Sequence, residues 1–245
     1  MLSIDDQIEA LFGRRELPRD AGVLHVTALT QRPDGYRTIV IDEGSPRSPR
    51  DFFSLQLARA RADAIIITGK LLRDEAALDY TFRGPHAEAL AAWRQSVQKR
   101  KGMPTLVVLT RSGRLPAEHP IWRAATETIV LTGAAGETEA KRRLPDTQVE
   151  RLAQPGLIAS IELVESMGAK TIALEAGPST TRAAYDAGRV DELMLSTFLG
   201  PFSDSMKETS APFDLEQLQS ALPTSDGSRE FTEPSGTWHF ERRSR

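Results

Sequence analysis

The amino-acid sequence predicts an α/β protein in three layers, with a mostly parallel central sheet and helices on both of its faces. Four short segments are apolar at almost every position and rich in β-branched residues, which is typical of parallel strands that are covered on both sides. Segments with a helical spacing of apolar residues lie between them. Strands that alternate with helices in this way indicate βαβ units, and therefore the α/β class.

The strands are predicted from the pattern of apolar residues. The four apolar segments are residues 63–68, 105–110, 128–132 and 171–175. Residues 147–152 and 192–198 alternate between apolar and polar positions, which predicts strands near an edge of the sheet or with one face in water. A last alternating strand is predicted over residues 237–242, followed by a basic tail that we expect to be solvated.

Helix boundaries are predicted from capping residues and from glycine stops. Ser48 followed by Pro49 at the first helical position is a typical helix start. The predicted helices run from Ser48 to about Ala62, from His86 to Arg100, from Leu157 to Gly168, from Ser179 to Gly188 and over residues 214–222, with a short helix after Ser3. The remainder of residues 203–236 is rich in Pro, Ser and Gly and predicts loops.

The domain organisation is predicted from what separates these segments. No linker is long enough to divide the chain, and no internal repeat is present. We therefore expect one domain over residues 1–245, in which residues 1–21 form an N-terminal helical extension and residues 22–242 form the core.

The composition excludes several classes of function. The charges nearly cancel, with 31 Lys and Arg against 34 Asp and Glu, so that neither nucleic acid nor an anionic membrane is an expected partner. The absence of cysteine excludes disulfides, thiolate–zinc sites, iron–sulfur clusters and zinc-dependent nucleobase deaminases. The four histidines show no metal-ligand spacing, so we expect no metal site. No signal peptide or transmembrane helix is recognisable, and the cytoplasm is the expected location.

Three turns that follow the apolar strands carry residues that suit an anionic ligand. The turns are Thr68, Gly69 and Lys70; Thr110, Arg111 and Ser112; and Glu175, Ala176, Gly177, Pro178, Ser179 and Thr180. Each turn alone is ordinary loop or helix-start chemistry, and the Rossmann and P-loop fingerprints are both missing. The carboxyl ends of parallel strands lie along one edge of a sheet, where ligands of open α/β sheets bind. The three turns together therefore predict a site for a phosphate-bearing ligand.

Several segments resemble one known family. They are Arg59–Gly69, Pro104–Pro116, Thr171–Ser179, Gly188–Leu193 and Leu199–Pro201. Their motifs and spacing resemble the C-terminal reductase domain of the bifunctional riboflavin-biosynthesis deaminase-reductases, which has the dihydrofolate-reductase-like fold. The resemblance spans roughly Leu24 to Phe240, and the deaminase half has no counterpart here.

The resemblance implies an NADPH-dependent reductase of an aminopyrimidine ribosyl phosphate or a related heterocycle, in which hydride reaches a C=O or C=N carbon. It places the first turn at the cofactor pyrophosphate, the second at the adenosine 2′-phosphate, and the third at a cofactor phosphate. Glu175 is implied to orient substrate hydroxyls or assist proton transfer, with a capping or salt-bridged carboxylate as the open alternative. The substrate contacts that it implies are His25, Thr30, Asp34 and Arg83. A homodimer is expected, since members of the family commonly pair.

Three departures from the family pattern keep a second interpretation open. Ala176 stands where the family has glycine, and Leu72 stands near a family threonine. Residues 30–35 replace a substrate-lining motif with a segment that is two residues longer. The alternative is a catalytically degenerate module on the same fold that binds a nucleotide or serves as an oligomerisation partner.

Overall fold

The computed structural model describes residues 2–17, 21–40, 43–76, 78–124, 126–201 and 207–245. Its strands are β1 (Gly22–Arg32), β2 (Gly35–Val40), β3 (Ala64–Thr68), β4 (Thr105–Leu109), β5 (Thr128–Thr132), β6 (Gln148–Arg151), β7 (Thr171–Glu175), β8 (Glu192–Phe198), β9 (Lys207–Phe213), β10 (Thr224–Glu233) and β11 (Gly236–Ser244). Its helices are α1 (Ile4–Phe12), α2 (Pro49–Arg61), α3 (Gly69–Asp74), α4 (Ala87–Ser96), α5 (Ala134–Arg143), α6 (Leu157–Ser166), α7 (Pro178–Asp186) and α8 (Leu215–Ala221), with a 3-10 turn at Pro120–Arg123.

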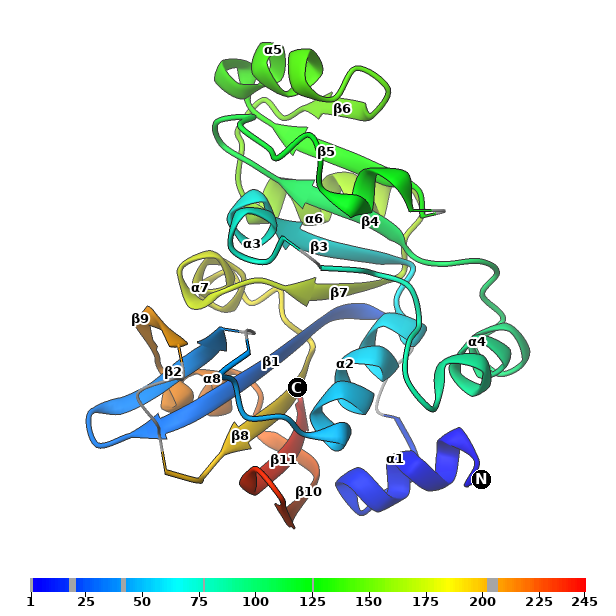
Figure 1. Ribbon diagram of the computed structural model, residues 1–245, viewed down its shortest axis with the longest axis vertical. Coiled ribbons are helices and arrows are strands. Elements are labelled where there is room, and N and C mark those ends of the chain that lie inside the picture. Colours follow the sequence, from blue (N-terminus) through cyan, green and yellow to red (C-terminus); the bar gives the residue numbers. More distant parts are fainter. Residues whose placement is uncertain (1, 18–20, 41–42, 77, 125, 202–206) are drawn as a thin grey trace.

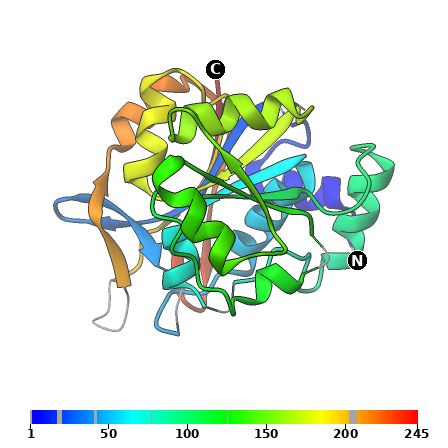
Figure 2. The same ribbon diagram turned by 90° about the horizontal axis from the view of Figure 1, so that it is seen from above.

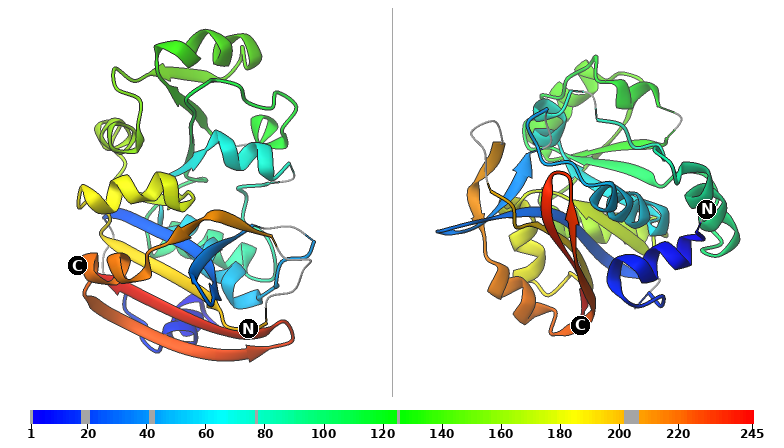
Figure 3. Two further views of the ribbon diagram at one scale, coloured as in Figure 1. Left: turned by 90° about the vertical axis from the view of Figure 1, so that its left-hand side faces the viewer. Right: turned by 60° about the horizontal axis from the view of Figure 1, so that its bottom comes forward.

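The strands form one sheet in the order β10-β11-β8-β1-β7-β3-β4-β5-β6 (Figure 1). From β8 to β6 every neighbouring pair is parallel. β10 and β11 extend the sheet antiparallel beyond β8, whereas β2 pairs with β1 and β9 with β2 off this path (Figure 3). The predicted class, a mostly parallel sheet with flanking helices, is confirmed.

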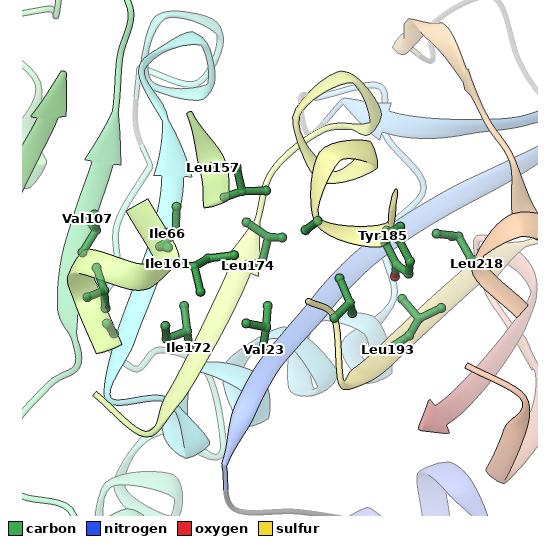
Figure 4. Close-up of a cluster of buried hydrophobic side chains, with 14 of the residues drawn as sticks. Val23, Ile66, Val107, Leu157, Ile161, Ile172, Leu174, Tyr185, Leu193 and Leu218 are labelled. Carbon is green, nitrogen blue, oxygen red and sulfur yellow. The ribbon is translucent and has the colours of Figure 1, made fainter. Parts of the chain in front are cut away.

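Helices cover both faces of the sheet (Figure 2). On one face, α6 and α7 press Leu157, Ile161 and Tyr185 against apolar side chains of the strands, including Ile172 and Leu174 (Figure 4). On the other face, α1, α2 and α4 form a second apolar cluster with β1, β8 and β11. A third cluster joins the second side of β3, β4, β5 and β7 to α3, the 3-10 turn and α5. These four strands are therefore covered on both faces, which is the reason that they are apolar along both of their sides.

One strand predicted near an edge lies inside the sheet. β8 runs between β1 and β11 and is buried along its whole length. The carboxylate of Glu192, which in the sequence indicates a wet face, accepts hydrogen bonds from Arg61 at 2.7 Å to each oxygen. The prediction of an edge strand over residues 147–152 is confirmed, because β6 is the edge strand and its residues are partly or fully exposed.

The prediction of loops within residues 203–236 is wrong over two segments. β9 and β10 are strands there, while residues 202–206 lie outside the described part of the chain. β10 is mostly exposed, and its pairing along β11, rather than an apolar alternation, holds it in the sheet. The first two residues of the tail predicted to be solvated, Arg243 and Ser244, belong to β11, where Ser244 is buried and Arg243 is half-buried, whereas Arg245 is exposed.

Two helix predictions also need correction. The helix predicted from His86 to Arg100 ends at Ser96, because Arg94 turns inward to donate to backbone carbonyls of α2 and its C-cap, and Lys99 adopts a left-handed φ of 57°. The helix that we expected Ser179 to cap begins earlier, with Gly177 as its N-cap and Pro178 in its first turn. Proline suits that position because its φ is fixed and it lacks the N–H that would be unpaired.

Candidate functional site

The strand-end turns predicted from the sequence lie together at the carboxyl edge of the sheet. β3, β4 and β7 are parallel, so their ends point the same way, and Figure 1 shows α3 and α7 beside each other at the ends of β3 and β7. The first two turns are packed directly on one another. A Cβ added to Gly69 would lie 3.2 Å from Cβ of Thr110 and 2.7 Å from Cδ2 of Leu115.

A fourth turn, which the sequence analysis did not single out, belongs to the same edge. It follows β5 and forms the start of α5, from Gly133 to Gly136. A Cβ on Gly136 would lie 2.7 Å from the carbonyl oxygen of Arg111. Two glycines three residues apart, directly after an apolar strand, are the signal that identifies this turn.

Three helices at this edge, α5, α6 and α7, begin without a side-chain cap. Gly177 is the N-cap of α7 and Gly133 is the N-cap of α5, and neither has a side chain that accepts from the first-turn N–H groups. Gly177 has an ordinary φ of −71°, and nothing lies within 4 Å of the position that its Cβ would occupy. The fold itself therefore does not require glycine at 177. An open helix start with a bare backbone is suited to a phosphate.

The polar side chains of the first two turns differ in burial. Lys70 is 73% exposed and forms an ion pair with Asp74. Thr110 is buried, whereas Arg111 and Ser112 are exposed at the surface of the turn. Thr68 caps α3 by accepting from the N–H of Leu71. The guanidinium of Arg111 is therefore placed to meet a ligand from solvent.

Glu175 is held in a buried ion pair. Its two carboxylate oxygens accept from Nε and Nη2 of Arg59 at 2.8 and 2.7 Å. The guanidinium of Arg59 also lies 4.3 Å above the ring of Tyr80 and donates to the carbonyl of Asp79. Of the two roles considered for Glu175, the structure shows the salt-bridged carboxylate. The sequence analysis did not identify Arg59 and Tyr80 as part of this site. They are distant from Glu175 in the sequence, and no local pattern indicates that they contact it.

Burial changes the pKa of a second carboxyl group close to Glu175, that of Glu75. The side chain of Glu75, at the end of α3, has its pKa raised to about 7, mainly by burial and then by the negative charge of Glu175, with Arg59 opposing this. The same edge therefore holds one carboxylate neutralised by an arginine and a second that binds a proton near neutrality.

The four residues implied as substrate contacts are not brought together. Thr30, at the carboxyl end of β1, is buried with its Oγ1 unpaired. His25 is fully buried, with Nδ1 2.8 Å from the Tyr185 hydroxyl and its ring stacked on Phe213. Burial lowers the pKa of His25 to about 3. The ring is therefore neutral and enclosed, which does not favour a direct substrate contact.

Asp34 and Arg83 lie on the surface in separate places. Asp34 is in the turn of the β1–β2 hairpin, 69% exposed and paired with Arg37 at 2.7 Å. Arg83 precedes α4, with its guanidinium 3.7 Å from Asp79 and its backbone N–H donating to Gln56. His25, Thr30, Asp34 and Arg83 all stay predicted substrate contacts.

The two departures within the turns are accommodated by packing. Leu72 is 1% exposed and belongs to the apolar cluster beneath α3. Ala176 packs its methyl group against the cluster beneath α6 and α7. At both positions an apolar side chain contacts the core of the protein.

A comparison with protein-family models assigns this architecture. Residues 30–202 match the model of the RibD C-terminal domain. The chain belongs to this family. The match covers all of the strand-end turns described above, and the family resemblance predicted from the sequence is confirmed.

Solved structures share the fold of this RibD C-terminal domain chain. A pyrimidine reductase-like protein of Corynebacterium diphtheriae superposes with a TM-score of 0.62 at 20% identity, over 99% of this chain and 98% of the other. RibD of Acinetobacter baumannii gives 0.62 at 17% identity, over 92% of this chain and 58% of its own. A riboflavin biosynthesis reductase of Saccharomyces cerevisiae gives 0.53 at 13%, over 98% of both. A search of curated protein sequences finds no significant match.

Other features of the surface do not coincide with the strand-end turns. A hollow of about 40 Å³ lies between α7 and the β9–α8 segment, and one of about 320 Å³ lies at the opposite, amino edge of β3 to β5. Among the described residues, no group of three or more His, Asp and Glu side chains is arranged to hold a metal ion. Within the same part of the chain, no helix is both long and apolar enough to span a membrane.

Proposed function

We propose that this chain is an NADPH-dependent reductase that adds hydride to a C=O or C=N carbon of an aminopyrimidine ribosyl phosphate or a related heterocycle. The chain is an oxidoreductase by family, since it belongs to the RibD C-terminal domain reductases. The cofactor and the substrate are the proposed part. The observation that carries them is the open start of α7 at Gly177, beside three further turns on one edge of the sheet.

The residues present suit a dinucleotide phosphate. The bare backbone of Gly177, with the first turn of α7, offers N–H groups to a phosphate, as do Gly69 and Lys70 at the start of α3. When bound, NADPH supplies the hydride. Arg111, exposed beside Ser112, supplies the positive charge for the 2′-phosphate that distinguishes NADPH from NADH.

The role of Arg111 leads to a direct prediction. Arg111→Ala is expected to weaken NADPH binding about 10- to 100-fold and to leave NADH binding unchanged, because a charge-assisted contact contributes about 1.5–3 kcal/mol. Energy transfer from the three tryptophans to the nicotinamide, titrated with each dinucleotide, measures both affinities.

Arg123→Ala is the matched control, since Arg123 is 76% exposed and lies in the separate 3-10 turn. It should leave both affinities unchanged. An Arg111→Ala protein that keeps the wild-type preference for NADPH would show that the 2′-phosphate binds elsewhere. A wild-type protein that binds neither dinucleotide would overturn the whole proposal.

The substrate class is tested separately with 5-amino-6-(5-phosphoribosylamino)uracil. We expect the wild-type protein to oxidise NADPH in its presence, with reduction of the sugar C1′ to a ribityl chain. Binding of NADPH without turnover of this or related pyrimidines would favour the degenerate nucleotide-binding module. We also propose a cytoplasmic homodimer, which sedimentation at micromolar concentration tests.

A further inference from the structure

A half-buried carboxyl group, that of Asp51, lies at the same edge of the sheet, but toward β8 rather than toward the turns proposed to hold the cofactor. α2 leads into β3 and runs back across the sheet, so its first turn, which contains Asp51, lies at the carboxyl edge. Asp51 is hydrogen-bonded to Ser196 of β8. Ser196 is 1% exposed and pairs in register with Ala28 of β1. The carboxyl group of Asp51 therefore occupies the corner between α2, β1 and β8.

A second carboxyl group faces the same corner. Glu233, at the end of β10, acts on Asp51 through its negative charge. Its side chain is 2% exposed, and its Oε1 accepts from Nη1 of Arg50 at 2.8 Å. Arg50 points outward, 45% exposed, with its guanidinium 4.1 Å above the ring of Phe231. Glu233 thus has one oxygen paired and one turned away from its arginine.

Three buried polar atoms around this corner have no hydrogen-bond partner among the described residues. They are Oγ1 of Thr30, Oγ of Ser54 and Oε2 of Glu233. Ser54 follows Asp51 by three residues, so both lie on one face of α2. Thr30 follows Ala28 by two residues in β1, so both face the same side of the sheet. Buried polar atoms are normally paired, and a set of unpaired ones in one corner indicates a polar ligand.

Reduction of a polar double bond needs a proton as well as a hydride. The hydride adds to carbon, the π electrons move to the oxygen or nitrogen, and that atom must then be protonated. Glu175 does not suit this task, because both of its oxygens accept from the Arg59 cation. Among the residues that the structure describes, no arginine or lysine forms an ion pair with Asp51.

We propose that Asp51 is the proton donor of the reduction, that Glu233 is a positioning residue which keeps Asp51 protonated, and that Thr30 and Ser54 bind the polar edge of the substrate. This inference rests on the proposed hydride transfer. In the step, the carboxyl O–H bond of Asp51 breaks as the substrate O–H or N–H bond forms. Asp51 is left as a carboxylate and recovers its proton from water.

The surroundings of Asp51 give the direction of the pH dependence. Burial raises its pKa to about 6, the hydrogen bond from Ser196 opposes this, and the charge of Glu233 adds to it. Arg50 on the same helix is bound to Glu233, and the residues of β1 and β8 at this corner, Ala28, Thr30 and Ser196, are uncharged. The ring of His86 packs edge-on against Phe53 of the same helix. A donor must be protonated, so turnover is expected to fall as pH rises through about 6.

The first test uses turnover of NADPH with 5-amino-6-(5-phosphoribosylamino)uracil. Asp51→Asn is expected to lower kcat about 100- to 10,000-fold, to leave KM and NADPH binding nearly unchanged, and to abolish the pH dependence near 6. Glu233→Gln should shift that pH dependence to lower pH. Glu230→Gln, an exposed glutamate on the same strand, is the matched control and should change nothing. An Asp51→Asn enzyme with wild-type kcat would overturn the proposal.

The second test needs no substrate and separates this inference from the proposed function. Infrared difference spectra of the protein with ¹³C-labelled aspartate should show a carboxyl that titrates near pH 6. That signal should be lost in Asp51→Asn and should move to lower pH in Glu233→Gln. If no aspartate titrates there, Asp51 is not a poised acid, even in a protein that binds NADPH. If the signal is present but NADPH does not bind, the proposed function fails and Asp51 has no hydride transfer to serve.

Discussion

Replacing Arg59 by methionine is expected to lower the free energy of unfolding by about 3–5 kcal/mol, because it leaves the buried charge of Glu175 without its partner. Both side chains of this pair are less than one-tenth exposed, and the two hydrogen bonds between them are 2.7 and 2.8 Å long. The pair joins α2 to the end of β7, next to the turn that is proposed to hold a cofactor phosphate. Urea unfolding followed by tryptophan fluorescence measures the change.

Two control variants test whether the loss of stability comes from the unpaired buried charge of Glu175 or simply from the loss of an arginine. Arg189→Met removes a bidentate pair with Glu165 at the surface, where the two side chains are 29% and 41% exposed, and should cost about 1 kcal/mol or less. Combining Arg59→Met with Glu175→Leu should restore part of the lost stability, because no unpaired charge remains. A cost for Arg59→Met equal to that of Arg189→Met would show that Glu175 is solvated.

Replacing Gly177 by valine is expected to weaken NADPH binding by at least about 10-fold, or 1.4 kcal/mol, while the protein stays folded. The space beside Gly177 is open and its φ is ordinary, so a side chain meets nothing in the protein. The methyl groups would instead occupy the space through which a phosphate approaches the start of α7. Tryptophan-to-nicotinamide energy transfer measures the affinity, and urea unfolding measures the stability.

Gly156→Val is the matched control for this variant. Gly156 is also a helix N-cap, with open space beside it and an extended φ of 179°, but it begins α6 after the edge strand β6. Both variants should lose a similar, small amount of stability at the helix start. Only Gly177→Val should lose NADPH. Equal affinities in the two variants would show that the start of α7 does not hold a cofactor phosphate.

Much of the parallel half of the sheet is predictable from local sequence. β3, β4, β5 and β7 begin and end within a residue or so of the predicted boundaries, because a strand buried on both faces has apolar residues throughout. The start of α2 is equally local, since the Ser48 hydroxyl accepts from the N–H of Asp51 as predicted for a cap. The strand-end turns follow from the same strands, as their place at one edge is a consequence of parallel pairing.

In the antiparallel part of the sheet, β11 was predicted but β10 was not, for a physical reason. β10 is mostly exposed and contains few apolar residues, so it has no pattern to recognise, and its register with β11 supplies what holds it. β8 was predicted as a wetter strand because Glu192 is charged. The cation that allows its burial is Arg61, which is distant in the sequence and reaches it only from α2.

The amino-acid sequence by itself determined the class of fold, the family and the turns that are proposed to hold the cofactor, since these depend on runs of neighbouring residues. Only the tertiary structure decided which groups surround the carboxyl groups of Asp51 and Glu175. Asp51, in the first turn of α2, is half-buried beside Ser196 and Glu233 from strands far along the chain. Glu175, which the sequence marks as a reactive candidate, is neutralised by Arg59. Burial and charge pairing set the proton affinity of a carboxyl group, and both arise only when distant segments pack together.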